Sequence, residues 1–139
     1  MSGETNLDRL IADMTASLSP ETFVFVTRAD GQIPDGLTPK MVFQEAEGTT
    51  LIVKRSQAEA HRLPYEFECR MITLNVHSAL DAVGFIASIA SDLALAGMGV
   101  NLVAGFFHDH LFIPEGREED AMAILNAKAT AAAAKLQAS

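Results

Sequence analysis

The sequence has few of the features that mark secreted or nucleic-acid-binding proteins. Cys69 is the single cysteine among 139 residues, so an intramolecular disulfide and a zinc site of several cysteines are both excluded. Ten Lys and Arg stand against 18 Asp and Glu, which gives a net charge of −8. That charge opposes a phosphate backbone, and no basic cluster reverses it locally. We therefore expect no nucleic-acid partner.

Long apolar runs are also missing. The most apolar stretch, 79–100, is interrupted by Asp81 and Asp92, and the uncharged run between them is well short of the ~18 residues that span a bilayer. The first ten residues, MSGETNLDRL, contain acids and no apolar segment of the kind found in secretory signals. With 49% hydrophobic and 20% charged residues, the composition is that of a globular protein. We expect a cytoplasmic protein without a membrane partner.

The first half of the chain alternates between helical and extended patterns. Leu7, Leu10, Ile11, Met14 and Leu18 have the spacing of an amphipathic helix, which the Ser19-Pro20 pair should end. Ser56 and Glu59 form a capping-box pattern at the start of a second helix. In chain order we predict a helix over 6–18, a strand over 22–28, turns over 29–40, strands over 41–47 and 49–54, a helix over 56–62 and an edge strand over 65–69.

The second half contains the strongest helical pattern. Ser78 is the expected N-cap, Asp81 lies at the third helical position, and Gly97 ends the helix. In chain order we predict a strand over 71–77, a helix over 78–97, strands over 100–107 and 109–113 with His108 in the turn, and a helix over 115–134 whose Ala-rich tail frays.

This order of elements indicates a ferredoxin-like sandwich. A strand–helix–strand crossover, followed by a hairpin that returns between the two parallel strands, gives the split βαβ arrangement. The first half ends in the same hairpin-then-helix order. We therefore predict an α+β protein with two tandem ferredoxin-like (βαββαβ) units, over 1–67 and 68–139. Neither unit completes its own sheet, so we expect a shared or swapped strand between them.

The stretch 77–125 resembles the ACT domain, a small-molecule-sensing module of amino-acid metabolism. The resemblance lies in a strand end followed by a helix with Val83-Gly84-Phe85-Ile86, then Ala96-Gly97, Asn101-Leu102, a hairpin and an alanine-containing helix. Aspartokinase regulatory domains, short bacterial proteins of two ACT-like units and animal cytosolic arginine sensors are similar. These motifs are specific for the fold and uninformative about the ligand.

The resemblance implies a regulatory protein without enzymatic activity that binds a small molecule, an amino acid above all. The ligand is expected at an interface between ACT units, in a homodimer, with no cofactor. The matching site positions are His77, Ser78, Asp81, Ala82, Val83, Gly84, Asn101 and Leu102. Two features depart from the aspartokinase pattern: Met98-Gly99 adds a residue before Val100, and His108-Asp109-His110 replaces the usual turn.

Chemistry alone supports two interpretations of the helix start. Free N–H groups at a helix N-terminus favour a carboxylate, Asp81 could pair with an ammonium group, and Gly84 would let a ligand approach. Equally, Ser78 and Asp81 could simply cap the helix. Asn101 is unusual on a predicted strand, where it could bind ligand or cross-link the sheet.

The histidines suggest a further alternative. His77, at the end of one predicted strand, should lie near His108 and His110 at the start of another, with Asp109 close by. We treat His108, Asp109 and His110 as secondary ligand-binding candidates and assign no metal. A histidine-based metal protein is one alternative function, and an interaction module without a ligand is another. The sequence has no phosphate-binding loop, dinucleotide fingerprint or nucleophile–base pair, so we expect no enzyme.

Overall fold

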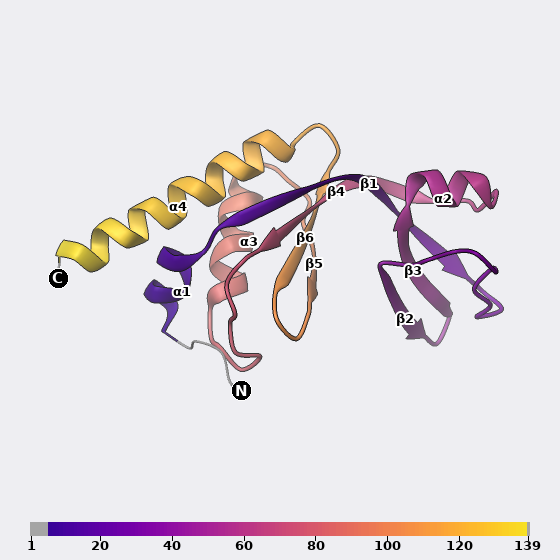
Figure 1. The fold of residues 1–139 in the computed structure, drawn as a ribbon, viewed down its shortest axis with the longest axis horizontal. Helices are drawn as coiled ribbons and strands as arrows, with labels where there is room; N and C mark the ends of the chain where they lie inside the picture. Colours follow the sequence, from indigo (N-terminus) through magenta and orange to yellow (C-terminus); the bar gives the residue numbers. More distant parts are fainter. Residues whose placement is uncertain (1–5, 139) are drawn as a thin grey trace. The chain divides into compact units, whose positions relative to one another are not determined.

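The computed structural model describes residues 6–138 of the chain. These residues form two compact units, described here separately. The middle unit is formed by residues 20–70, and the terminal unit by residues 6–19 together with 71–138. Two long strands, β1 (Ala16–Arg28) and β4 (Glu66–Leu74), have residues in both units (Figure 1). The predicted division into ACT-like units over 1–67 and 68–139 refers to sequence resemblance and not to these compact units. It stays a prediction.

The middle unit is built around a β-hairpin. Strand β2 (Met41–Glu45) pairs with β3 (Gly48–Lys54), and β3 pairs on its other side with β1, both in antiparallel register. Alternate side chains of β1 and β3 form the core of this unit together with residues of α2 (Arg55–Ala60) and the neighbouring loops. The buried members are Val24, Val26, Leu37, Leu51, Val53, Ala58 and Leu63. The predicted hairpin is confirmed.

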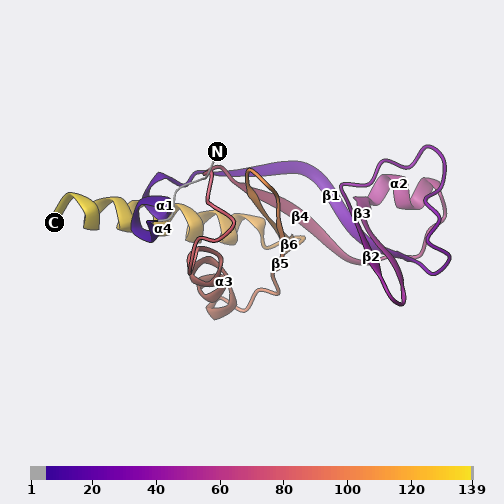
Figure 2. The same cartoon turned by 90° about the horizontal axis from the view of Figure 1, so that it is seen from below.

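The terminal unit has the predicted strand–helix–hairpin–helix order. After β4 come α3 (Phe85–Leu95), β5 (Asn101–Ala104), β6 (Asp109–Pro114) and α4 (Glu118–Ala138), while α1 (Leu7–Asp13) precedes β1. Strand β6 lies between β4 and β5, which is the inserted antiparallel strand of the split βαβ arrangement. Figure 2 shows the same elements from below. The α+β fold class is confirmed.

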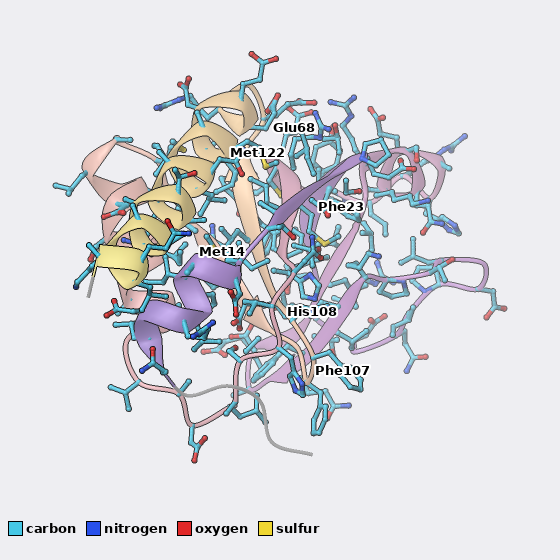
Figure 3. The ribbon with its side chains drawn as sticks, turned by 60° about the vertical axis from the view of Figure 1, so that its left-hand side comes forward. Met14, Phe23, Glu68, Phe107, His108 and Met122 are labelled. Carbon is cyan, nitrogen blue, oxygen red and sulfur yellow. The ribbon has the colours of Figure 1, made fainter. Side chains whose placement is uncertain are left out.

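Three helices cover one side of this part of the sheet. Ile72 and Leu74 of β4 and Leu111 and Ile113 of β6 point to the same face. Against them pack buried side chains of α1, α3 and α4, with their neighbours: Leu10, Ile11, Met14, Phe85, Ile89, Leu93, Met98, Ala121 and Leu125. Helices α1 and α4 lie side by side, with Met14 and Met122 in view in Figure 3. The buried residues of the three helices have the i, i+3, i+4 spacing that predicts a helix from the sequence.

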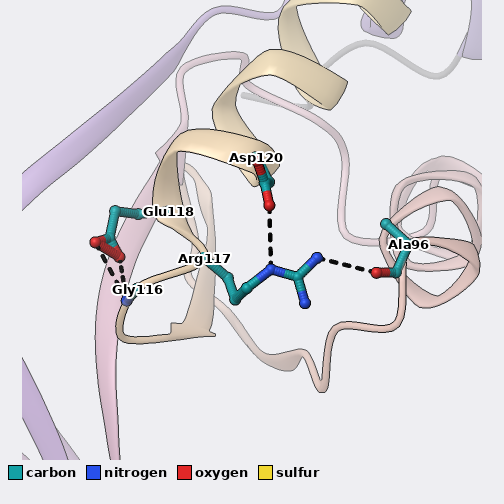
Figure 4. Close-up of polar contacts among 5 residues, drawn as sticks. All are labelled: Ala96, Gly116, Arg117, Glu118 and Asp120. Atoms are coloured by element: carbon teal, nitrogen blue, oxygen red, sulfur yellow. Dashed lines mark hydrogen bonds and ion pairs between the residues drawn. The ribbon is translucent and has the colours of Figure 1, made fainter.

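Polar contacts hold α3 against α4. The guanidinium of Arg117 donates from Nη2 to the carbonyl of Ala96 at the end of α3, at 3.0 Å, and from Nε to Asp120 at 3.2 Å (Figure 4). Lys128 of α4 pairs with Asp92 of α3 at 2.7 Å. Together these contacts fix the orientation of α3, whose opposite end forms the candidate site.

Several predicted boundaries were wrong. The first helix ends at Asp13 rather than at 18, because the chain from Ala16 onward pairs as strand β1. The predicted strands 65–69 and 71–77 are one continuous strand, β4. Helix α2 has Lys54 at its N-cap and no side-chain cap, so the capping box at Ser56 does not form.

The start of the central helix is the largest correction. We predicted a helix from 78, but α3 begins at Phe85, with Gly84 as its N-cap. Residues 75–84 form no helix, and Ser78 donates its hydroxyl to Asp109 instead of capping. The strand predicted over 100–107 ends at Ala104.

The last helix does not fray as predicted. Helix α4 continues to Ala138, because Ala129 and Ala132 pack on the core and Lys135 pairs with Asp8 of α1. Within residues 6–138, no helix combines the length and apolarity that a membrane crossing requires.

Candidate functional site

A pocket of about 240 Å³ lies at the N-terminal end of α3. Three segments form its walls: the loop that follows β4, the first turn of α3, and the β5–β6 hairpin. The lining residues are Ser78, Ala79, Leu80, Ala82, Gly84, Phe85, Ile86, Ala87, Ala104, Gly105 and Asp109. Nearly all of these side chains are small or apolar, so the polar groups among them decide what the pocket can hold.

The first polar feature is the start of α3. Gly84 has φ +89°, a left-handed conformation that glycine adopts without strain, and its carbonyl accepts the first helical hydrogen bond from Ser88 at 2.9 Å. No side chain in the described chain caps this helix. The N–H groups of its first turn are therefore left to water or a ligand, and the positive end of the helix dipole borders the pocket.

The second polar feature is the carboxylate of Asp109, the first residue of β6. Its side chain is only 7% exposed, and its Oδ2 accepts a hydrogen bond from the Ser78 hydroxyl at 3.2 Å. Within residues 6–138 this carboxylate has no ion pair with a basic side chain and no second hydrogen bond. Buried carboxylates are normally paired, because burial without a counter-charge is costly. The pocket thus contains a largely buried carboxylate whose one hydrogen-bond partner among the described residues is the Ser78 hydroxyl.

The hairpin holds Asp109 in this position through a close backbone approach at Gly105. The Gly105 N–H donates to the His108 carbonyl at 2.9 Å. A Cβ at residue 105 would lie 2.8 Å from that same carbonyl oxygen and 3.4 Å from Nε2 of His110. Only glycine fits without moving the turn, so Gly105 fixes the strand start that carries Asp109.

The structure gathers part of the predicted site. Ser78, Ala82 and Gly84 line the pocket, and so does the secondary candidate Asp109. The other predicted positions, His77, Asp81, Val83, Asn101 and Leu102, are not among its lining residues. Asp81 is exposed, and the buried carboxylate among the lining residues is that of Asp109. The ligand-binding role of all these residues stays a prediction.

Sequence reasoning missed the rest of the wall because it placed the helix start seven residues too early. With α3 beginning at Phe85, the turn that borders the pocket is formed by residues 84–87. The adjacent small residues Ala104 and Gly105, directly before a turn, were the signal in the sequence that could have pointed to the hairpin wall.

The three histidines of the predicted cluster have different neighbours in the structure. His77 makes tilted ring contacts with Phe106 and Phe107, and its ring centroid lies 5.7 Å from that of Phe107. The Nδ1 of His110 lies 2.9 Å from the Thr73 hydroxyl, and His108 is closest to the Val76 carbonyl. Figure 3 shows Phe107 and His108 at the β5–β6 turn. Within residues 6–138 no three metal-ligating side chains come together.

A second pocket, of about 490 Å³, lies in the middle unit. It is lined by Phe25, Val26, Thr27, Thr50, Pro64, Tyr65 and Glu66. Partial burial raises the pKa of the Tyr65 phenol above its ordinary value, and the carboxylates of Glu59 and Glu68 add to this. It contains no buried charge, so it offers less to a specific ligand than the pocket at α3.

Family models described as the ACT domain match residues 2–70 and 66–127. A solved protein of unknown function from Vibrio cholerae, described as a possible transport protein, is 34% identical, with a TM-score of 0.80 over 88% of this chain and 95% of that one. The chain belongs to the ACT-domain family. It carries two ACT domains in tandem, as the resemblance implied.

Other solved structures share the fold at lower identity. The regulatory subunit of aspartate kinase from Thermus flavus is 11% identical, with a TM-score of 0.62 over 92% of this chain and 99% of that one. A protein from Agrobacterium tumefaciens is 15% identical, with a TM-score of 0.71 over 84% and 89% of the two chains. No curated protein matches the sequence.

Proposed function

We propose that this tandem ACT-domain protein is a non-enzymatic regulatory protein that binds a free amino acid in the pocket at the start of α3. The observation that supports this most is the carboxylate of Asp109, buried without a counter-charge beside an uncapped helix N-terminus. A free amino acid carries both missing partners, an ammonium group and a carboxylate, on one carbon atom.

The two charges of such a ligand have distinct places. Its carboxylate accepts hydrogen bonds from the N–H groups of the first turn of α3, where the helix dipole favours negative charge. Its ammonium group pairs with Asp109, which Ser78 orients through the 3.2 Å hydrogen bond. The volume of about 240 Å³ is below the ~300–1,000 Å³ of pockets for drug-sized molecules and fits a small metabolite.

Regulation would follow from a homodimer whose ligand completes an interface between ACT domains. Four large apolar side chains that line the pocket or lie within two residues of a lining residue are well exposed: Leu80, Val83, Phe106 and Phe107. A ligand that contacts one arrangement of two copies better than another shifts the population toward it. The predicted positions His77, Asp81, Val83, Asn101 and Leu102 belong to this proposed interface.

The test is a thermal-shift screen of the full chain with each of the twenty amino acids, for the wild type, Asp109→Asn and Asp13→Asn. At a ligand concentration of 100 times Kd, linkage adds about 2.7 kcal/mol to stability. Asp109→Asn removes the buried charge, so the free protein should be as stable as the wild type or more so, yet lose the ligand-induced rise in Tm. Asp13→Asn is the control, because Asp13 is exposed and lies outside both the pocket and the proposed interface, and it should keep that rise.

The two variants separate binding at this pocket from nonspecific effects. A rise in Tm that survives Asp109→Asn would place the ligand elsewhere. If no amino acid raises Tm in the wild type, the alternative of a ligand-free interaction module gains support, because the exposed Phe106 and Phe107 offer a surface for a protein partner.

A further inference from the structure

We infer that the amino acid bound at the start of α3 has a small aliphatic side chain, and that the pocket rejects aspartate, glutamate and lysine. This inference rests on the proposed function and adds the chemical class of the ligand. It follows from which groups line the pocket once the ligand's α-ammonium and α-carboxylate have been placed.

The pocket has no further charged group that could pair with a charged side chain of the ligand. Asp109 is the only charged residue among the lining residues, and the ligand's α-ammonium pairs with it. The helix N-terminus accommodates the α-carboxylate. A second carboxylate, as in glutamate, or a second ammonium, as in lysine, would lose water without gaining a partner.

The basic side chains of the terminal unit do not supply the missing charge. None of Arg9, Arg117, Lys128 and Lys135 lines the pocket. Arg117 donates to Ala96 at the opposite end of α3, Lys128 pairs with Asp92, and Lys135 pairs with Asp8. Within one copy of the chain, an acidic ligand would therefore find no basic side chain in the pocket wall to pair with its side-chain charge.

The remaining walls fit an aliphatic group of limited size. Ala79, Ala82, Ala87 and Ala104 present methyl groups, and Leu80 and Ile86 present larger apolar surfaces. Leu80 is 71% exposed in the free protein, so a bound aliphatic side chain would cover part of it. The volume of about 240 Å³ has room for an amino acid with an aliphatic side chain. Alanine, valine, leucine and isoleucine meet these conditions.

The experiment is calorimetric titration of the full chain at neutral pH with valine, leucine, glutamate, aspartate and lysine. We expect valine or leucine to bind at least about tenfold more tightly than the three charged amino acids. The variant Leu80→Arg adds a cation at the pocket wall on an exposed side chain, and should raise the affinity for glutamate relative to leucine. Leu95→Arg is the matched control, because Leu95 is 87% exposed at the far end of α3 and lies outside the pocket.

The outcomes separate this inference from the function on which it rests. Tighter binding of an aliphatic amino acid, with the preference shifted by Leu80→Arg and unchanged by Leu95→Arg, supports both. Tighter binding of a charged amino acid overturns the inference and leaves the proposed function in place. Binding of none of the five, together with no hit among the twenty in the thermal screen, overturns both.

Discussion

Replacing Gly105 with alanine tests whether the β5–β6 turn builds the pocket. The added Cβ would lie 2.8 Å from the His108 carbonyl oxygen, well inside the 3.4 Å or more of ordinary contact. The atom in its way is backbone, and the Gly105 N–H to His108 hydrogen bond holds that backbone in place. The turn must therefore distort, and overpacking of this kind costs about 1–3 kcal/mol.

The matched control is Gly99→Ala. A Cβ at Gly99 meets no atom within 4 Å, and the residue is exposed with a backbone conformation open to alanine. At such a position the loss of unfolded-state entropy stabilises by about 0.4–1 kcal/mol. The two variants make the same chemical change in the same unit and should move stability in opposite directions.

Urea unfolding measures the difference directly. We expect Gly105→Ala to have the lower unfolding free energy by at least about 1 kcal/mol, which corresponds to ~3–5 °C in Tm for a chain of this size. Because Gly105 and Asp109 line the same pocket, Gly105→Ala should also weaken amino-acid binding, while Gly99→Ala should not. Equal midpoints for the two variants would refute the packing argument at this turn.

Two further predictions concern other contacts. Arg117→Ala should lower the unfolding free energy by about 1 kcal/mol, because the Ala96 carbonyl loses its charged donor. Lys135→Ala removes a more exposed ion pair and should change the unfolding free energy little. Urea unfolding of both variants measures the difference. The phenol of Tyr65, the only tyrosine in a chain without tryptophan, should titrate above pH 10 by phenolate absorbance, and Glu59→Gln should lower that midpoint. As the pH rises past 10, Tyr65 ionises in the unfolded chain before it does in the folded chain, so the unfolding free energy falls. A titration midpoint at the ordinary tyrosine value would contradict the partial burial of Tyr65.

The order of elements was predictable because it depends on patterns within a few residues. The hairpins over 41–54 and 101–114 follow from alternating apolar residues on either side of a turn. The place of β6 between β4 and β5 follows from the hairpin return of the split βαβ arrangement. The ACT family resemblance came from the same stretch of small and apolar residues.

The element boundaries were less predictable because strand pairing competes with local helix signals. The pattern through Leu18 is helical, yet the Thr15 carbonyl accepts a hydrogen bond from the Asn75 N–H at 2.7 Å, and the Asn75 amide donates to Ser17. These contacts join segments about 60 residues apart, and they stabilise the extended chain where a local rule favours a helix.

The candidate site also depends partly on local sequence and partly on tertiary contacts. The amino-acid sequence by itself determined that a helix start, a serine and a carboxylate would be near one another in an ACT domain. Only the tertiary structure decided that the carboxylate is Asp109, because the Ser78 hydroxyl that could have capped a helix locally donates instead to a residue 31 positions away. A serine hydroxyl can accept a hydrogen bond from a helix N–H group as an N-cap, or donate one to a distant carboxylate. Which of the two bonds forms depends on the folding of the whole unit.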